Sequence, residues 1–244
     1  MPELARSAHP VASSICRNCG NRGHGHFCQE CGQSYATHRI SFPHLLHEVF
    51  HLFTHLDKGF LYTLKELIRL PGDMQREYLA GQRYRHQKPF SMFFVAITVT
   101  ALGQYFIKAL VFKLYGMSDD SQDYFRHYFS LMQMALLPLY AFITWLFFRK
   151  SEYNYAEIAV LVLYSLSLVI FVVLLLNISR LLFPNFETEY IELPFIVAYN
   201  TITYFRLFPA DSRWLIVSKS LLINTACFAL SHVAAELVVH LLEK

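Results

Sequence analysis

The sequence predicts an all-α polytopic membrane protein of about five transmembrane helices, with a small zinc-ribbon module at the N-terminus. Three observations lead to this class. Of the 244 residues, 55% are hydrophobic and only 16% are charged, whereas soluble domains carry about 25% charged residues. The apolar residues gather after residue 89 in runs close to the ~20 residues that cross a bilayer core. Four of the five cysteines, in contrast, cluster near the N-terminus.

Five apolar stretches follow residue 89, and each is a candidate transmembrane helix. The fourth is shorter and carries Asn200, Thr201 and Thr203, so it also suits a re-entrant or interfacial segment. The predicted spans comprise about residues 90–114, 128–148, 155–183, 192–208 and 214–242.

Basic and acidic residues alternate along the connections between the predicted spans. Basic residues precede the first span, follow the second at Arg149–Lys150, and lie between the last two at Arg206 and Arg213. Acidic residues occupy the other connections, around Asp119 and Glu187. Because basic loops stay on the cytoplasmic side, this pattern predicts a cytoplasmic N-terminus and an external C-terminus. The first residues also lack the apolar region of a secretory signal.

The chain therefore divides into four predicted segments. Residues 1–14 are rich in Ala, Ser, Pro and charge, which is typical of a disordered tail. Residues 15–34 form the four-cysteine zinc ribbon, and residues 35–89 form an amphipathic, juxtamembrane helical collar. Residues 90–244 form the transmembrane helical domain.

Two Cys-x-x-Cys-Gly motifs lie eight residues apart and predict one metal site. In a reducing compartment, such clustering favours a metal ion over disulfides. Four thiolates can surround one zinc ion tetrahedrally, which leaves no open coordination position and indicates a structural role. The module is too small for an adequate apolar core, so metal binding would supply its folding free energy. The predicted ligands are Cys16, Cys19, Cys28 and Cys31.

Other residues of this module leave alternatives open. Gly20 and Gly32 follow the second cysteine of each motif, where the chain must bend tightly. His24 and His26 lie between the motifs and could replace a cysteine ligand, although exposed loop histidines are the simpler interpretation. Iron in a rubredoxin-like site is an alternative to zinc.

Residues Ser41–Leu70 have a helical pattern that ends at Pro71–Gly72. Within 43–56, apolar and polar side chains take opposite sides of the helix. The apolar side could pack on the following segment, Phe60–Leu70, or lie among lipid headgroups. The polar side could bind a metal or sense pH, although a solvated face is the simpler interpretation. The apolar side comprises Leu45, Val49, Leu52, Phe53 and Leu56, and the polar side comprises His44, His47, Glu48, His51 and His55.

A basic tract at Arg83, Arg85 and Lys88 leads into the first predicted span. These side chains could bind lipid phosphate or a protein partner, or they could simply hold the loop on the cytoplasmic side. Two glycines before the basic tract suit tight bends: Gly59, before the helical segment that ends at Pro71–Gly72, and Gly81, just before the tract.

Three ionisable residues of the last span share one helical face, because His232, Glu236 and His240 are spaced four residues apart. An ionisable group within a span is a candidate functional group, since leaving it in lipid is costly. The three residues could form a proton relay or a metal site, or His232 could simply pair with Glu236. Polar residues of other spans are expected to hydrogen-bond between helices, namely Gln104, Asn177 and Asn200.

Four motifs in the N-terminal third carry a family resemblance. They are CxxCG…FCxxCGQ at Cys16–Gln33, His38–Ile40, DKGFLYTLKELIRLPG at Asp57–Gly72 and EYLAGQRYRHQKPF at Glu77–Phe90. Together they resemble the bacterial membrane proteins of the domain-of-unknown-function 3667 family. In the apolar remainder the likeness is only a hydropathy pattern. The resemblance implies a zinc-ribbon head on a multi-span body, and it brings no activity, substrate or catalytic residue.

These features predict a bacterial inner-membrane protein whose cytoplasmic head and collar bind or regulate a protein partner. The alternative is a transporter or lipid-handling protein with a regulatory zinc head, which would need a polar cavity between the spans. The sequence has no phosphate-binding loop, nucleophile elbow or zincin helix motif, so neither catalytic residues nor an enzyme is predicted. Nucleic-acid binding is not expected, because anionic lipid accounts for the modest basic excess beside the membrane.

Overall fold

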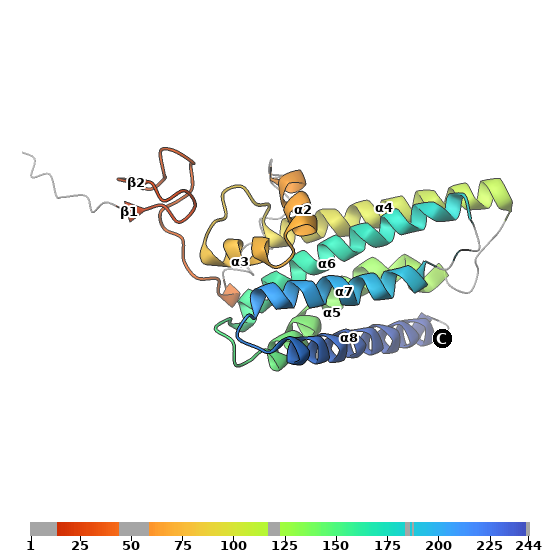
Figure 1. Ribbon diagram of the computed structural model, residues 1–244. Coiled ribbons are helices and arrows are strands. Elements are labelled where there is room, and N and C mark those ends of the chain that lie inside the picture. Colours follow the sequence, from red (N-terminus) through yellow and green to blue (C-terminus); the bar gives the residue numbers. More distant parts are fainter. Residues whose placement is uncertain (1–13, 44–58, 117–122, 184–185, 187, 243–244) are drawn as a thin grey trace, which may run out of the picture.

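The computed structural model describes residues 14–43, 59–116, 123–183, 186 and 188–242 (Figure 1). A two-stranded antiparallel sheet opens this part of the chain, in which β1 (Ser14–Ile15) pairs with β2 (Arg22–Gly23). Seven α-helices and one short 3-10 helix follow in the described residues. The predicted tail at residues 1–13 lies outside the described residues, whereas Ser14 already belongs to β1.

Five long helices make up the body of the protein and run alongside one another (Figure 1). Each reverses the direction of the one before, so the head and the start of α4 lie at one end while the C-terminus lies at the other. The helices are α4 (Pro89–Tyr115), α5 (Asp123–Phe147), α6 (Tyr155–Ile178), α7 (Glu189–Leu207) and α8 (Arg213–Leu242).

Three of these helices are long and apolar enough to cross a membrane, which is compatible with a membrane protein. They comprise residues Pro89–Tyr115, Tyr155–Leu181 and Arg213–Val238. In the described part of α5, the apolar stretch Met132–Phe147 is shorter. The five predicted spans therefore correspond to α4–α8 in position, while three of them meet the length and composition of a span.

Helix α6 lies at the centre of the body. Its side chains are apolar all round, as expected for a helix without a solvent face, and α4, α5 and α7 all pack against it. The Tyr164 side chain is fully buried in this core. Its hydroxyl donates a hydrogen bond to the Gln87 carbonyl, 2.6 Å away, just before α4 begins. The central helix thus also fixes where the first long helix starts.

Helices α4 and α6 run in the same direction and approach closely at Gly103. A Cβ atom at Gly103 would lie 2.6 Å from the Cδ1 atom of Leu174, so the contact depends on the missing side chain. Close by, the Thr100 hydroxyl donates to the Ile170 carbonyl at 3.3 Å. Small residues commonly allow such approaches between helices in membranes.

Helix α8 is joined to its neighbours by polar side chains. The Asn200 side-chain amide on α7 donates to Asn224 Oδ1 on α8 at 2.7 Å, and the Thr201 and Ser220 hydroxyls lie 2.7 Å apart. The expected interhelical role of Asn200 is therefore confirmed. Asn177 donates to the Val173 carbonyl within its own helix and to Glu192 on α7, at 2.8 and 3.5 Å.

Two short helices, α2 (Phe60–Arg69) and α3 (Asp73–Ala80), form the described part of the collar. The histidine-bearing segment 44–58 lies outside the described residues. A turn at Gly59 precedes α2, and the bend there needs glycine, because a Cβ would lie 2.6 Å from the Arg85 carbonyl oxygen. The helix ends before Pro71–Gly72 as predicted.

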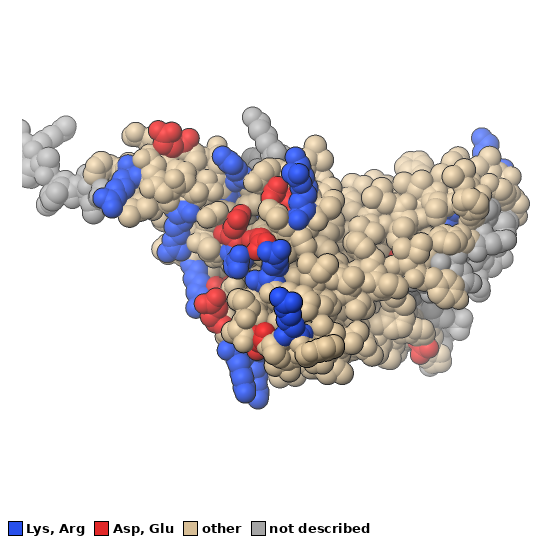
Figure 2. All heavy atoms as spheres, viewed as in Figure 1, with Lys and Arg blue, Asp and Glu red and all other residues tan. Residues whose placement is uncertain are grey.

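Charged side chains gather at the head end of the molecule. Figure 2 shows Lys, Arg, Asp and Glu over the head, the collar and the adjoining ends of the long helices, while the viewed flank of the body is almost free of charge. The predicted basic connections at Arg149–Lys150, Arg206 and Arg213 all lie at this end. The body thus has one strongly charged end and a broad apolar flank.

We expect Gly103→Val to destabilise the body by about 1–3 kcal/mol, because the added methyl groups would force α4 away from Leu174. The thermal unfolding temperature of the protein in detergent would measure this loss. Ala101→Val is the matched control, since Ala101 is exposed on the same helix. Equal unfolding temperatures for the two variants would contradict the close approach.

Candidate metal centre and its attachment to the helices

The two cysteine motifs fold into turns with the same hydrogen-bond pattern. Cys16 N donates to the Asn21 carbonyl and Gly20 N to the Cys16 carbonyl, both at 2.9 Å. The second motif repeats these two bonds at 2.8 Å, with Cys28 in the place of Cys16. Gly20 and Gly32 have φ angles of +75° and +77°, a conformation that side-chain-bearing residues rarely adopt. The tight bends predicted after each motif are therefore confirmed.

The turns bring the four cysteine sulfurs into one cluster. All four Sγ atoms lie within 4.8 Å of one another, and the Sγ atoms of Cys16 and Cys31, like those of Cys19 and Cys28, are 3.5 Å apart. Four thiolates around one zinc ion would have sulfurs ~3.8 Å apart, as Zn–S bonds of ~2.3 Å require. The described cysteines can therefore hold one metal ion. His24 and His26 are exposed and lie outside this cluster.

The polypeptide backbone favours a thiolate at Cys28. The backbone N–H of Cys31, and after it that of Glu30, hydrogen-bonds to Cys28 and lowers the pKa of its thiol from 9.0 to about 6. A thiolate is the form that binds a metal ion. The backbone of the second turn therefore favours the thiolate form at Cys28.

Gln33 attaches the four-cysteine head to the collar. Its side chain is buried and reaches the loop between α3 and α4. The Nε2 atom donates to the Gly81 carbonyl at 2.8 Å, while Oε1 accepts from the backbone N–H groups of Arg83 and Tyr84 at 3.0 and 3.1 Å. A single amide thus satisfies three backbone groups of the loop. Because Cys28 N donates to the Gln33 carbonyl, the same residue also closes the second cysteine turn.

The loop approaches the head closely at Gly81, which ends α3 with φ +107°. A Cβ there would lie 2.8 Å from Arg17 Cδ in the head and 3.2 Å from Thr37 Cγ2, just after the head. The Arg83 guanidinium donates to the Tyr78 and His38 carbonyls at 3.2 and 3.1 Å. Arg83 is therefore a structural tie between the collar and the segment that follows the cysteines.

A charged contact joins this segment to the central helix. The Arg39 guanidinium donates to both carboxylate oxygens of Glu157 at 2.7 Å and also to the Glu152 carbonyl. Glu157 lies in the first turn of α6 and its side chain is only 5% exposed. Asn154, which caps α6, donates to the Ile40 carbonyl at 3.1 Å. The head is thus fixed to the body as well as to the collar.

The predicted functional residues outside the head have different surroundings. Arg85 and Lys88 are exposed, whereas Arg83 is half-buried and hydrogen-bonded to backbone carbonyls. His232, Glu236 and His240 are exposed on α8, and His232 Nδ1 lies 3.4 Å from Glu236 Oε1. The predicted pairing of the first two is therefore confirmed.

Three residues that join the head to the rest, Gln33, Arg39 and Glu157, were not singled out from the sequence as functional. Arg39 and Glu157 are 118 residues apart, so no local pattern relates them. Gln33 directly follows the second CxxCG motif, but the role of its side chain depends on a loop about 50 residues later in the chain.

Fold and site together define a class: a helical protein with membrane-span-like helices that carries a four-cysteine cluster able to bind a metal ion. A family model described as "Protein of unknown function (DUF3667)" matches residues 57–101. This match confirms the resemblance to the DUF3667 family found in the sequence. The match includes α2, α3, the loop at 81–88 and the first part of α4, and it does not include the four cysteines. Neither the curated proteins nor the solved structures contain a match.

We expect Gln33→Leu to loosen the head from the collar, because it leaves three backbone groups of the loop without partners. The cost would be about 2–4 kcal/mol. Hydrogen exchange at the amides of Arg83 and Tyr84 would rise, while the metal content of the protein would stay the same. Gln29→Leu is the matched control, since Gln29 is exposed in the same cysteine turn. Unchanged exchange in Gln33→Leu would contradict this attachment.

His86 should make the stability of the collar depend on pH. Its ring lies between Tyr62 and Tyr78, at centroid distances of 5.4 and 6.3 Å. Burial, with a smaller contribution from Arg85, lowers the pKa of His86 from 6.5 to about 4. As the pH falls below about 6.5, the unfolded chain therefore takes up a proton that the folded chain does not. The stabilisation is complete above that pH and is lost between about 6.5 and 4.

The size of this loss is about 1–2 kcal/mol. Unfolding temperatures in detergent at pH 7.5 and 5 would measure it for the wild type and for His86→Phe. The variant should lose less stability on acidification than the wild type. The same loss in both proteins would show that other groups cause the acid sensitivity.

Proposed function

We propose that this chain is a non-enzymatic protein of the bacterial inner membrane whose zinc-bearing head and collar bind or regulate a cytoplasmic protein partner. The observation that carries the proposal is the attachment of the head through Gln33 and Arg39. Both side chains hold the cysteine module in one position on the helices. A module held in this way presents a fixed outer surface at the end of an apolar body.

Zinc is the proposed ion because four thiolates form a soft, tetrahedral ligand set. With all four positions taken by Cys16, Cys19, Cys28 and Cys31, no position is open to substrate or water. The ion would therefore stabilise the head and supply no catalysis.

The distribution of charge supports a cytoplasmic head. Basic residues accumulate on the cytoplasmic side of membrane proteins, and here they gather at the head end of the body (Figure 2). In the same orientation, the C-terminal end of α8 would face outward, and α4–α8 would provide about five spans.

The outer surface of the head supports partner binding. Ile15 and Phe27 are 58% and 65% exposed, which is high for apolar side chains in such a small module. Arg17 and Arg22 are also exposed on the head. Apolar side chains beside arginines are typical of protein interfaces.

The transporter alternative required polar side chains of several spans to converge on one cavity. Of the predicted set, Gln104, Asn177, Asn200, His232 and Glu236, the last four have separate partners in the described residues. Asn200 pairs with Asn224, Asn177 pairs with Glu192, and His232 pairs with Glu236 on an exposed face. This arrangement favours the partner-binding proposal.

We expect the double substitution Cys28→Ser plus Cys31→Ser to abolish stoichiometric zinc binding and the capture of the protein partner. Removing two of four thiolates leaves too few soft ligands for a structural site. Elemental analysis of the purified, detergent-solubilised protein would measure the zinc, and cross-linking followed by mass spectrometry would identify the partner.

Cys227→Ser is the matched control, because Cys227 lies on α8, away from the cysteine cluster. It should retain both the zinc and the partner. Identical partners for the wild type and the double variant, together with altered solute or lipid movement in liposomes, would favour the transporter alternative.

A further inference from the structure

Helix α2 has one face packed on the body and another that is exposed. Its inner face consists of Phe60, Thr63, Leu64 and Leu67, at the spacing of one helical face. The Phe60 ring meets Phe171 of α6 edge-on, with centroids 5.7 Å apart. Thr63 Oγ1 accepts a hydrogen bond from Gln87 N at 2.7 Å. These contacts fix the orientation of α2 and therefore determine which side chains point outward.

The outward face of α2 combines large apolar side chains with basic ones. Leu61 and Ile68 are 75% and 61% exposed, and Lys65 and Arg69 are exposed beside them. The spacing of these four residues, i, i+4, i+7 and i+8, places them on one side of the helix. Glu66 is the only acidic residue of α2. Soluble surfaces rarely combine bulky aliphatic and basic residues in this way, whereas helices that lie in the lipid headgroup layer do.

More basic side chains lie at the N-terminal end of α2. Gly59 abuts the backbone of Arg85 and Gln87, and the Tyr62 ring lies 5.4 Å from the His86 ring, so the loop that carries Arg85 and Lys88 adjoins this helix. Within the described part of the chain, none of the four cations Lys65, Arg69, Arg85 and Lys88 forms an ion pair. Charge complementarity therefore calls for an anionic partner.

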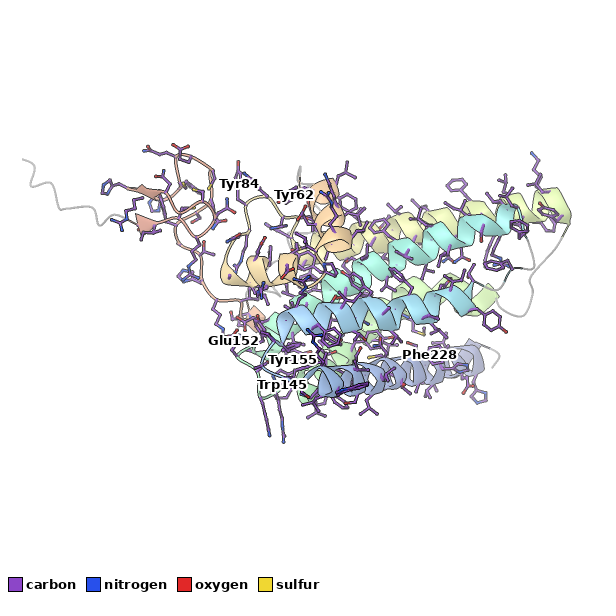
Figure 3. The ribbon with its side chains drawn as sticks, viewed as in Figure 1. Tyr62, Tyr84, Trp145, Glu152, Tyr155 and Phe228 are labelled. Atoms are coloured by element: carbon purple, nitrogen blue, oxygen red, sulfur yellow. The ribbon has the colours of Figure 1, made fainter. Side chains whose placement is uncertain are left out.

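The position of α2 along the body identifies that partner. Figure 3 shows Tyr62 on α2 at the same end of the long helices as Trp145 and Tyr155. Aromatic side chains of this kind concentrate where a bilayer meets water. Figure 2 shows the charged end of the molecule giving way to the apolar flank near this level. Helix α4, which begins at this end of the body, also carries large exposed apolar side chains, among them Val99 and Leu102.

We propose that the outward face of α2 binds the headgroups of anionic phospholipids at the membrane surface on the side of the head. Leu61 and Ile68 lie at the boundary of the acyl chains, while Lys65 and Arg69 extend along it to the phosphates. Arg85 and Lys88 contact neighbouring headgroups from the adjoining loop. The inference rests on the membrane location in the proposed function, but not on the zinc ion or the protein partner.

Tryptophan quenching by brominated lipids tests this inference on the full chain. Trp145→Phe plus Trp214→Phe removes the natural tryptophans, and Leu61→Trp then places the single reporter on the outward face. The protein is reconstituted into phosphatidylcholine vesicles in which a fixed minor fraction of the lipid is brominated, either phosphatidylglycerol or phosphatidylcholine. Ile68→Trp in the same background provides a second reporter if Leu61→Trp folds poorly.

We expect strong quenching by both lipids and an enrichment of brominated phosphatidylglycerol around the reporter of about fivefold. Lys65→Gln plus Arg69→Gln should reduce this preference several-fold. Arg149→Gln plus Lys150→Gln is the matched control, because it removes the same charge from exposed positions at the same end of the molecule. That control should keep the preference.

Two results would overturn the inference. The absence of quenching by either lipid would mean that protein, from this chain or from a partner, covers the outward face of α2. Equal quenching by the two lipids would place the face in the bilayer without a preference for anionic headgroups. Either result leaves zinc content and partner capture unaffected, so a failure here is distinguishable from a failure of the proposed function.

Discussion

Backbone groups buried between the head and the long helices must all find hydrogen-bond partners, and this requirement organises the collar. An unpaired buried N–H or C=O group costs about 1–3 kcal/mol. Side chains satisfy these groups where regular structure cannot. Gln33 serves the loop at 81–84, Gln75 accepts from Gly72 N at 2.7 Å, and Thr63 and Tyr164 serve the two backbone groups of Gln87. The chain can therefore turn sharply several times within a buried joint.

The collar also connects the cysteine cluster to the long helices through hydrogen bonds. Gln33 closes the second cysteine turn through its carbonyl and holds the loop before α4 through its side chain. Arg39 continues the connection to the first turn of α6, the helix around which the body packs. The cysteine turns are thus linked to α4 and α6 through only a few hydrogen bonds. The family match at residues 57–101 coincides with this joint rather than with the cysteines.

Burial and charge separate the two ends of the body. Toward the head, ion pairs such as Asp73 with Arg206 and Asp211 with Lys219 tie the connections between helices together. The aromatic rings of Phe148 and Phe208 stack there at a centroid distance of 3.8 Å. Along the body, the contacts between helices are made mostly by apolar and uncharged polar side chains, and Glu192, which accepts from Asn177, is an exception. This division is the one that a bilayer beside an aqueous compartment would favour.

The sequence by itself determined the helical class, the approximate bounds of α4–α8, the stop at Pro71–Gly72 and the four cysteines as one set. These features depend on composition and on the spacing of nearby residues, and both can be read directly from the sequence. The family was also recognisable from local motifs. The number of spans, the identity of the ion, the protein partner and the sidedness are still predictions.

Only the tertiary structure decided which polar residues act as joints. Gln33, Arg39 and Glu157 find partners about 50 to 120 residues away, and no periodicity relates positions at such distances. The tertiary structure also distinguishes the members of the basic tract. Arg83 donates hydrogen bonds to the carbonyls of Tyr78 and His38, whereas Arg85 and Lys88 are exposed. Likewise, the outward face of α2 became recognisable only once Phe60 and Leu67 were packed against the body. Side-chain contacts of this kind depend on how helices are placed in space, which local propensity does not encode.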